Sequence, residues 1–274
     1  MNLWFSELHT KGSGLVLKVK KYLYSGNSPY QKIDIFESED YGKVLVLDGL
    51  VMTTERDEFI YHEMLTHPAM RIHPNPQSIL IIGGGDGGTA REALRYSEVK
   101  RAVLVEIDEM VVELSKKYLG EISSAYNDPR LEVVIRDGIE FVKNCNERFD
   151  VIFLDTSDPV GPAEALYRKD FYQSLKKCLK KNGIISAQTE SPWVQKETVK
   201  KLYREIKDIF NDKIIYLAHI PTYPGGIWSF MLLGEKIELY DIKRPIPGKT
   251  KYYNDEIHRS MTALPEYFKH EIAE

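Results

Sequence analysis

Apolar runs of strand length alternate with stretches of helical spacing over the greater part of the chain. From residue 78 onward, the runs SILIIGG, RAVLVEID, RLEVVIRD, FDVIFLD and GIISAQ are each followed by a segment with a helical pattern, and two further strand-like runs cover residues 213–220 and 227–234. This alternation predicts parallel strands joined by right-handed crossovers, and the nearly continuous apolar runs predict a sheet covered on both faces. The expected fold class is α/β, with a Rossmann-like, doubly wound, mostly parallel sheet of the class I methyltransferase type.

The first part of the chain has a different pattern. Runs at 15–24, 30–38 and 43–53 partly alternate polar and apolar residues and are separated by the turn sequences SGNSP and EDYG. They predict a small antiparallel β domain at 1–56, followed by the Rossmann-like domain at 57–274. A β unit of this size is too small to be stable alone and is expected to pack on the main domain or on another subunit. Its exposed edges predict at least a homodimer.

Composition narrows the function classes. The chain has 274 residues, 43% of them hydrophobic and 28% charged, with a formal net charge of −4. No basic stripe is present, which argues against nucleic-acid binding, and no run of about 18 apolar residues is present, which argues against a membrane span. The amino terminus lacks an apolar signal core, and Cys145 and Cys178 form no CxxC motif. We therefore expect a cytoplasmic protein with two reduced thiols.

A glycine-rich loop joins the first parallel strand to its helix. In IIGGGDGGTARE, Gly83, Gly85 and Gly88 match GxGxxG, and Glu106 ends the next strand, where an acid can accept hydrogen bonds from ribose hydroxyls. Asp86 lies within the loop and would repel a pyrophosphate, whereas it suits a cationic ligand. The loop therefore favours a sulfonium nucleoside over a dinucleotide.

Acids accumulate at the predicted carboxyl ends of the strands. A single acid in such a place is more often a helix cap or a turn former. Together, however, they would line one crevice of a doubly wound sheet and repel one another unless a polycationic ligand joined them. The six acids are Asp86, Glu106, Asp137, Asp155, Asp158 and Glu190.

The order of the longer motifs resembles that of the spermidine synthases, the polyamine aminopropyltransferases. The motifs are GGGDGG, VEID, RDG, LDTSDPVGPAEALY, QTESPW and IPTYPGG, and the segment VLDGLVMTTERDEFIYHEM resembles the family's hairpin and first helix. The resemblance extends from about residue 4 to about residue 265. It implies transfer of an aminopropyl group from decarboxylated S-adenosylmethionine to putrescine by a homodimer or homotetramer, with spermidine and methylthioadenosine as products and no metal or other cofactor.

The resemblance also implies residue roles. Asp155 is expected to accept the proton, Asp86 to bind the aminopropyl ammonium, and Asp158 to hold an acceptor amine. The adenosine half of the donor is expected against Gln31, Gly83, Gly85, Glu106, Asp137, Gly138 and Pro162. The aminopropyl and diamine channel is expected against Tyr61, His62, Gln188, Glu190 and Tyr223, with Trp4 and Trp228 as further wall residues. His67 is expected to be structural.

Simple chemistry agrees with these roles. Displacement at a carbon beside a sulfonium needs chiefly an aligned, neutral amine and a base for its proton, so no metal is required. Asp86 would repel the carboxylate of intact S-adenosylmethionine and so select the decarboxylated donor. The segment 159–166 is a candidate lid. Two alternatives remain open at this stage: a methyltransferase that uses S-adenosylmethionine, and a non-catalytic protein that binds polyamines or nucleosides.

Overall fold

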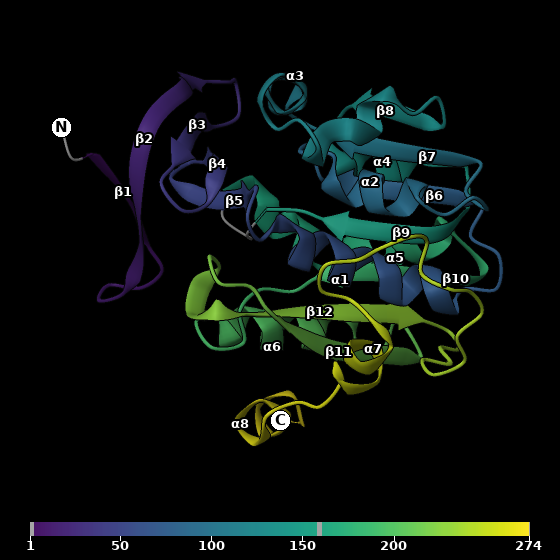
Figure 1. Cartoon of the computed structure of the whole chain (residues 1–274). Coiled ribbons are helices and arrows are strands. Elements are labelled where there is room, and N and C mark those ends of the chain that lie inside the picture. Colours follow the sequence, from purple (N-terminus) through teal and green to yellow (C-terminus); the bar gives the residue numbers. More distant parts are fainter. Residues whose placement is uncertain (1–2, 158–160, 274) are drawn as a thin grey trace.

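The amino-terminal part of the chain is a five-stranded antiparallel sheet (Figure 1). The computed structural model describes residues 3–157 and 161–273, without the side chains of 161–163 and 271–273. The strands lie in sequence order, and the second is the longest and carries two irregularities in its register with the third. They are β1 (Leu3–Leu8), β2 (Gly14–Asn27), β3 (Lys32–Ser38), β4 (Gly42–Leu47) and β5 (Leu50–Thr54).

The rest of the chain is built on a seven-stranded sheet with the order β11-β12-β10-β9-β6-β7-β8. The five strands from β10 to β8 are parallel, whereas β12 is antiparallel to β10 and to β11. From β6 the chain continues to β7 and β8 on one side, whereas β9 and β10 follow on the other side. The topological switch point therefore lies between β6 and β9. The strands are β6 (Ser78–Gly83), β7 (Arg101–Glu106), β8 (Leu131–Ile135), β9 (Phe149–Asp155), β10 (Leu179–Gln188), β11 (Asp212–His219) and β12 (Ile227–Gly234).

Helices cover both faces of this sheet. The apolar side chains of α1 (Glu58–Ile72) and α2 (Gly88–Leu94) share one core cluster with the sheet. Those of α4 (Gly138–Asn144), α5 (Lys169–Lys177) and α6 (Lys196–Ile206) share the cluster on the opposite face. This arrangement explains why Ile81 and Ile82, neighbours on β6, are both buried in different clusters.

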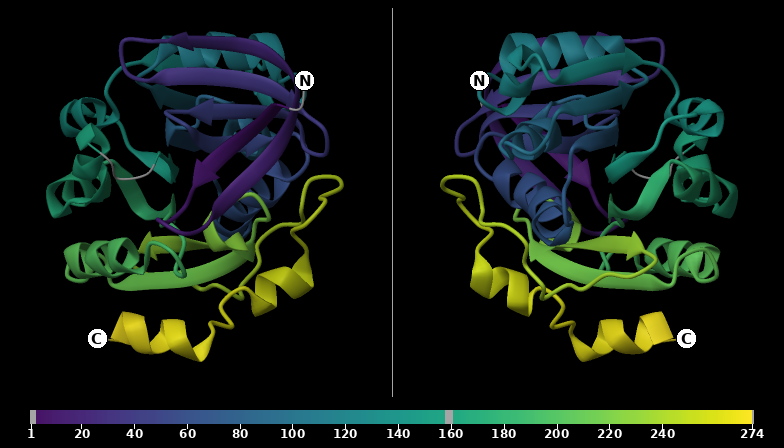
Figure 2. Two further views of the ribbon diagram at one scale, coloured as in Figure 1. Left: turned by 90° about the vertical axis from the view of Figure 1, so that its left-hand side faces the viewer. Right: turned by 90° about the vertical axis from the view of Figure 1, so that its right-hand side faces the viewer.

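The remaining helices connect this core to its surroundings. Helix α3 (Glu109–Tyr118) packs its apolar side chains against the amino-terminal sheet rather than against the seven-stranded one. The carboxyl-terminal helices α7 (Asp255–Ser260) and α8 (Glu266–Ala273) lie beside the edge of the large sheet (Figure 2). Three short 3-10 helices complete the described chain: η1 (Ile122–Asn127), η2 (Gly161–Tyr167) and η3 (Pro224–Gly226).

The predicted fold class is confirmed, with three differences in detail. The strand β1 was not predicted, because its sequence LWFSEL does not alternate apolar and polar residues, and its one buried side chain is that of Glu7. The segment VQKETVKKLYREIKDIF at 194–210 has a pattern that predicts a helix throughout, but the helix covers only Lys196–Ile206. The carboxyl-terminal helices were also not predicted.

The composition predicted two reduced thiols and argued against a membrane span. Cys145 and Cys178 are both free thiols. Among residues 3–157 and 161–273, no helix combines the length and the apolar character that crossing a membrane requires.

Asp57 ties the domain junction to the far edge of the large sheet. Its carboxylate accepts a hydrogen bond from the hydroxyl of Thr54 at 2.6 Å. It also accepts from the backbone N–H and the hydroxyl of Thr222 at 3.1 and 2.8 Å. All three residues are buried, so these bonds fix the start of α1 relative to the loop after β11.

We predict that Asp57→Ala lowers the free energy of unfolding by about 1–3 kcal/mol, because it leaves buried donors of Thr54 and Thr222 without their acceptor. Urea unfolding at a fixed protomer concentration measures the change. Glu39→Ala, which removes an exposed acid from the turn between β3 and β4, is the control and should change stability by less than about 0.5 kcal/mol. Equal effects of the two substitutions would contradict this role of Asp57.

Candidate active site

A cavity of about 340 Å³ lies between the two domains. The carboxyl ends of β6, β7 and β9 supply residues 83–86, 105–107 and 155–157 of its lining. The amino-terminal sheet and its loops close the opposite side with Glu7, Tyr30, Gln31, Leu45, Leu47, Asp48, Leu50, Val51 and Met52. The cavity therefore occupies the place where a doubly wound sheet binds its ligand.

The switch point itself needs glycine. Gly83 pairs with Asp155 across the parallel strands β6 and β9, and the N–H of Gly84 donates to the carbonyl oxygen of Asp155 at 2.9 Å. Gly83 has a φ of +81°, and a Cβ there would lie 2.1 Å from the same carbonyl oxygen. A larger residue at this position would push the two strand ends apart.

Asp155 ends β9 with both carboxylate oxygens hydrogen-bonded. Oδ1 accepts from the hydroxyl of Tyr61 and Oδ2 from the hydroxyl of Thr89, each at 2.7 Å. Burial and the neighbouring charge of Asp86 raise the pKa of Asp155, although these bonds and His62 act in the opposite direction. A fixed carboxylate with a raised pKa is suited to accept a proton.

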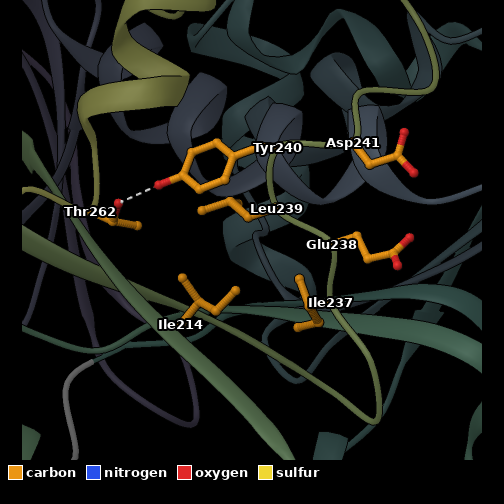
Figure 3. Close-up of a pocket in the computed structure, with 7 residues that line it drawn as sticks. All are labelled: Ile214, Ile237, Glu238, Leu239, Tyr240, Asp241 and Thr262. Carbon is orange, nitrogen blue, oxygen red and sulfur yellow. Dashed lines mark hydrogen bonds between the residues drawn. The ribbon is translucent and has the colours of Figure 1, made fainter.

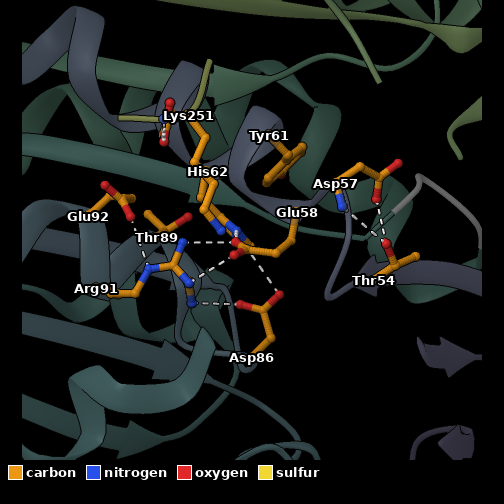
Figure 4. Close-up of polar contacts among 12 residues, drawn as sticks. Thr54, Asp57, Glu58, Tyr61, His62, Asp86, Thr89, Arg91, Glu92 and Lys251 are labelled. Carbon is orange, nitrogen blue, oxygen red and sulfur yellow. Dashed lines mark hydrogen bonds and ion pairs between the residues drawn. The ribbon is translucent and has the colours of Figure 1, made fainter. Parts of the chain in front are cut away.

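Asp86 lies opposite, in the glycine-rich loop, beside an ion-pair network (Figure 4). Its Oδ1 accepts from the N–H of Gly88 at 2.8 Å, and its Oδ2 lies 3.4 Å from Nε2 of His62. Burial favours the neutral acid, but the pKa of Asp86 is nevertheless lowered, chiefly by His62 and then by the N–H of Gly88. Asp86 is therefore an anion in the ligand-free site.

The network continues behind His62. Nδ1 of His62 lies 2.6 Å from Oε2 of Glu58, one helical turn earlier on α1. Arg91 on α2 donates to both oxygens of Glu58 at 3.0 and 2.8 Å and to Glu92 at 2.9 Å (Figure 4). His67 lies further along, 3.2 Å from Glu92 and outside the cavity lining described here.

The opposite end of the cavity has the residues expected against a nucleoside. Glu106 ends β7, and burial, together with the charges of Asp108 and Asp155, raises its pKa to about 7. Gln31 reaches across from the amino-terminal domain and donates to Asp108 at 2.9 Å. Asp137 accepts from two backbone N–H groups of α4 through Oδ1, so it also serves as a helix cap.

Aromatic rings form one wall between the two ends. The Tyr223 ring lies 5.7 Å from that of Tyr61 and 4.7 Å from that of Trp228. The Tyr223 hydroxyl donates to the carbonyl oxygen of Met52 and so links this wall to the amino-terminal domain. Such a wall can pack against methylene groups and can contact a cation through its π faces.

Thirteen of the predicted site residues thus line this one cavity. They are Gln31, Tyr61, His62, Gly83, Gly85, Asp86, Glu106, Asp137, Gly138, Asp155, Gln188, Tyr223 and Trp228. Their individual roles stay predictions.

The other predicted site residues do not appear in the described lining. Glu190 is fully buried, accepts from Gln188 and Tyr167, and adopts a φ of +76°, which is rare for a residue with a side chain. Trp4 is 54% exposed on β1, so its expected place in the wall is not formed within this chain. Asp158 lies outside the described residues, as do the first two residues of the candidate lid at 159–166 and the side chain of Pro162. The rest of the candidate lid belongs to η2, and its closure stays a prediction.

Sequence reasoning missed the supporting residues of the site. Thr89 binds Asp155, and the hydroxyl of Tyr126 donates to the carbonyl oxygen of Gly85 at 2.8 Å. The pair Glu58 and His62 could have been found from their spacing of four residues on one helix, which places them on the same face. For Arg91, the sequence offers no comparable signal, because its contact with Glu58 joins two different helices.

A second hollow lies on the surface beside β11 and the segment after β12 (Figure 3). Apolar side chains of Ile214, Ile237 and Leu239 line it together with Tyr240, whose hydroxyl lies 3.2 Å from that of Thr262. It is wide open, and its acids, Glu238 and Asp241, do not converge on one point (Figure 3). It therefore has no arrangement suited to catalysis.

Among the described residues, the cavity also contains one set of potential metal ligands. Ligand atoms of His62, Asp86 and Asp155 lie within 4.8 Å of one another. The same atoms face hydroxyl groups or each other, so the set can equally receive an organic cation. The expectation that no metal is required stays a prediction.

Comparison with known families shows two matches that together span most of the chain. Residues 58–243 match the spermine/spermidine synthase domain, and residues 3–55 match the spermidine synthase tetramerisation domain. The second match supports a homo-oligomer. Two similar proteins are named polyamine aminopropyltransferase: that of Caldicellulosiruptor bescii is 46% identical over 97% of both chains, and that of Thermoanaerobacter pseudethanolicus is 46% identical over 98% of both.

Solved structures agree with these matches. The crystal structure of spermidine synthase from Thermotoga maritima is 43% identical, with a TM-score of 0.95 over 100% of this chain and 95% of the other. A spermidine synthase in complex with the transition-state analogue AdoDATO is 44% identical, with a TM-score of 0.96 over 99% of this chain and 95% of the other. The chain therefore belongs to the spermine/spermidine synthase family, and it is an aminopropyltransferase.

Proposed function

We propose that this protein transfers the aminopropyl group of decarboxylated S-adenosylmethionine to putrescine and releases spermidine and methylthioadenosine. The observation that supports this most strongly is the pairing of Asp86 and Asp155 at the switch point. The first carboxylate is an anion suited to an ammonium, and the second has a raised pKa suited to a proton. A methyltransferase has no evident use for this pair.

In this proposal, the donor lies along the cavity with its nucleoside between Glu106 and Gln31. Its propyl ammonium reaches Asp86 and His62, and the aromatic wall covers the methylene groups. Intact S-adenosylmethionine would bring its carboxylate close to Asp86, where like charges repel in a partly buried site. This repulsion supports the choice of the decarboxylated donor.

The acceptor enters beside Asp155. One amine of putrescine attacks the propyl carbon next to the sulfonium with its lone pair. The new N–C bond forms as the C–S bond breaks, and the electron pair of that bond stays on sulfur as neutral methylthioadenosine. Asp155 accepts the proton that the attacking nitrogen loses, while Asp158 is proposed to hold the far ammonium. Alignment of the reactants supplies most of the acceleration.

We further propose that the homo-oligomer is a tetramer assembled through the amino-terminal domain. The family match at residues 3–55 supports this. So do the apolar side chains Leu3, Trp4, Leu8 and Val16, which are exposed on β1 and β2 of the single chain.

Asp155→Asn tests the proton step. We expect kcat with decarboxylated S-adenosylmethionine and putrescine to fall by about 10²–10⁴-fold, the usual contribution of a general base. Methylthioadenosine release measures the rate. Methylthioadenosine carries no reacting amine, so its affinity should stay unchanged. This affinity serves as the control for folding. A variant with wild-type kcat would contradict the role of Asp155.

Asp86→Asn tests donor recognition. Loss of one charge-assisted contact should weaken the decarboxylated donor by about 10- to 100-fold and narrow its advantage over intact S-adenosylmethionine. Dissociation constants for both sulfonium compounds measure the two effects. Methylthioadenosine lacks the ammonium and should bind as it does to the wild type. Unchanged affinities for both sulfonium compounds would contradict the proposal for Asp86.

Chelation tests the metal-independent mechanism. We expect dialysis against EDTA to leave the rate of transfer unchanged, because the displacement uses a sulfonium leaving group and a carboxylate base. Loss of activity that Mg²⁺ or Zn²⁺ restores would instead assign the ligand set of His62, Asp86 and Asp155 to a metal.

A further inference from the structure

Both ring nitrogens of His62 face carboxylates. Nδ1 lies 2.6 Å from Oε2 of Glu58, and Nε2 lies 3.4 Å from Oδ2 of Asp86. A neutral imidazole carries a proton on only one nitrogen, and the other nitrogen presents a lone pair. A neutral His62 would therefore aim a lone pair at one of two anions, whereas an imidazolium donates to both.

The ring cannot turn away from this arrangement. The side chain of His62 is 3% exposed, and Gly88 lies directly against the ring. A Cβ on Gly88 would lie 2.3 Å from Cε1 of His62, so the glycine is needed for the ring to fit. The fixed ring makes its protonation, rather than its orientation, the variable that a ligand can change.

The surrounding charges stabilise a cation at this point. Glu58 remains ionised because Arg91 holds both of its oxygens, and its pKa is lowered by His62 and Arg91 against the effect of burial. Burial alone lowers the pKa of His62, but Asp86 and Glu58 raise it well above its usual value. Among the described residues, the charged and titratable groups that face the imidazole include Glu58 and Tyr61 on its own helix, Asp86 in the glycine loop and Asp155 on β9. Arg91 on α2 acts on it through Glu58, and Tyr126 on η1 interacts with Asp86.

We propose that Glu58, clamped by Arg91, is a positioning residue that keeps His62 as an imidazolium on Asp86 in the ligand-free enzyme, and that the donor's ammonium enters in exchange for the imidazolium proton. This inference rests on the proposed function, because it assigns the ammonium of the donor to Asp86. It adds a proton release on donor binding, which is not part of the transfer reaction itself.

The exchange of a proton for an ammonium leaves the charge beside Asp86 unchanged, while the sulfonium adds its own positive charge to the cavity. Nε2 of His62 releases its proton to solvent, and the freed lone pair accepts a hydrogen bond from the entering ammonium beside Oδ2 of Asp86. Nδ1 keeps its proton on Glu58. One cation thus replaces another between Asp86 and Asp155, so the two carboxylates never face each other without a positive charge. Departure of the ammonium with the product returns the proton to His62.

The exchange fixes the direction of a pH effect. Below the pKa of His62 in the free enzyme, the donor must displace a proton, so its affinity falls by up to about tenfold for each unit of decreasing pH. Above that pKa, the affinity is independent of this group. Methylthioadenosine carries no ammonium and escapes the effect, although both ligands share any contribution from Glu106.

Titration calorimetry of the whole enzyme at pH 6.5, without an acceptor, tests the proposal, because the raised pKa of His62 keeps the free enzyme protonated there. The observed enthalpy in buffers of different ionisation enthalpy gives the number of protons released. We expect the decarboxylated donor, whose amine stays charged at this pH, to release close to one proton more than methylthioadenosine. The comparison of the two ligands removes the protons that the shared nucleoside contributes.

Two variants identify the group responsible. Glu58→Gln removes the anion behind His62, so the excess release should fall below half a proton while methylthioadenosine affinity is kept. Glu92→Gln removes another buried acid that binds Arg91 but does not contact His62, and it should retain the excess. Nitrogen-15 NMR of wild-type His62 gives an independent measurement: both ring nitrogens should be protonated in the free enzyme and only Nδ1 in the donor complex.

Three results would overturn the inference alone: equal proton release by the two ligands, an undiminished excess in Glu58→Gln, or a neutral His62 in the free enzyme. Failure of the enzyme to bind either the donor or methylthioadenosine would overturn the proposed function, and the inference with it. The two failures are thus distinguished by the same titrations.

Discussion

Repulsion between carboxylates at the switch point is the constraint on which the rest of the site depends. Parallel pairing of β6 with β9 brings the loop that carries Asp86 close to Asp155, and the hydrogen bond from Gly84 to the Asp155 carbonyl fixes the two strand ends together. Because neither acid can move away, a cation must lie between them or one acid must take up a proton. In the proposed mechanism, the imidazolium of His62 and the cationic substrates are alternative solutions to this single requirement.

The fold assigns the two halves of this solution to different elements. Helix α1 and helix α2 lie on the same face of the sheet and carry the network of Glu58, His62 and Arg91 behind the acids. The amino-terminal sheet closes the front and extends Gln31 toward the loop after β7. The buried contact of Asp57 with Thr222 holds these parts in register, so stability at the domain junction and geometry at the site are coupled.

Local patterns in the sequence were sufficient for the parallel core and for the residues at its strand ends. A strand that is buried on both faces and ends in Asp155 can be recognised without tertiary information, because the fold rule itself places strand ends at the ligand. The antiparallel strands β11 and β12 look like any other apolar run, and only their partners reveal their direction. The sequence of β1, LWFSEL, lacks the alternation of apolar and polar residues that marks a strand with one buried face.

Prediction of the site from the sequence was limited for the same reason, namely that contacts between elements decide it. Asp86 was predicted to face a cationic ligand, which stays a prediction, and sequence reasoning did not foresee that His62, held by Glu58 of the same helix, would lie against it. The expected role of Glu190 beside the channel stays a prediction, but its left-handed backbone and its contacts with Gln188 and Tyr167 could not be read from the sequence. Apart from the pair of Glu58 and His62 on one helix, such contacts depend on tertiary packing, which no spacing along the chain encodes.

The most direct measurement is a crystal structure of the enzyme with decarboxylated S-adenosylmethionine in the cavity. The account predicts that the propyl ammonium lies within hydrogen-bond distance of both Asp86 and Nε2 of His62, with the sulfonium-linked carbon open toward Asp155. A donor bound with its ammonium away from Asp86, or with a metal ion between Asp86 and Asp155, would contradict it.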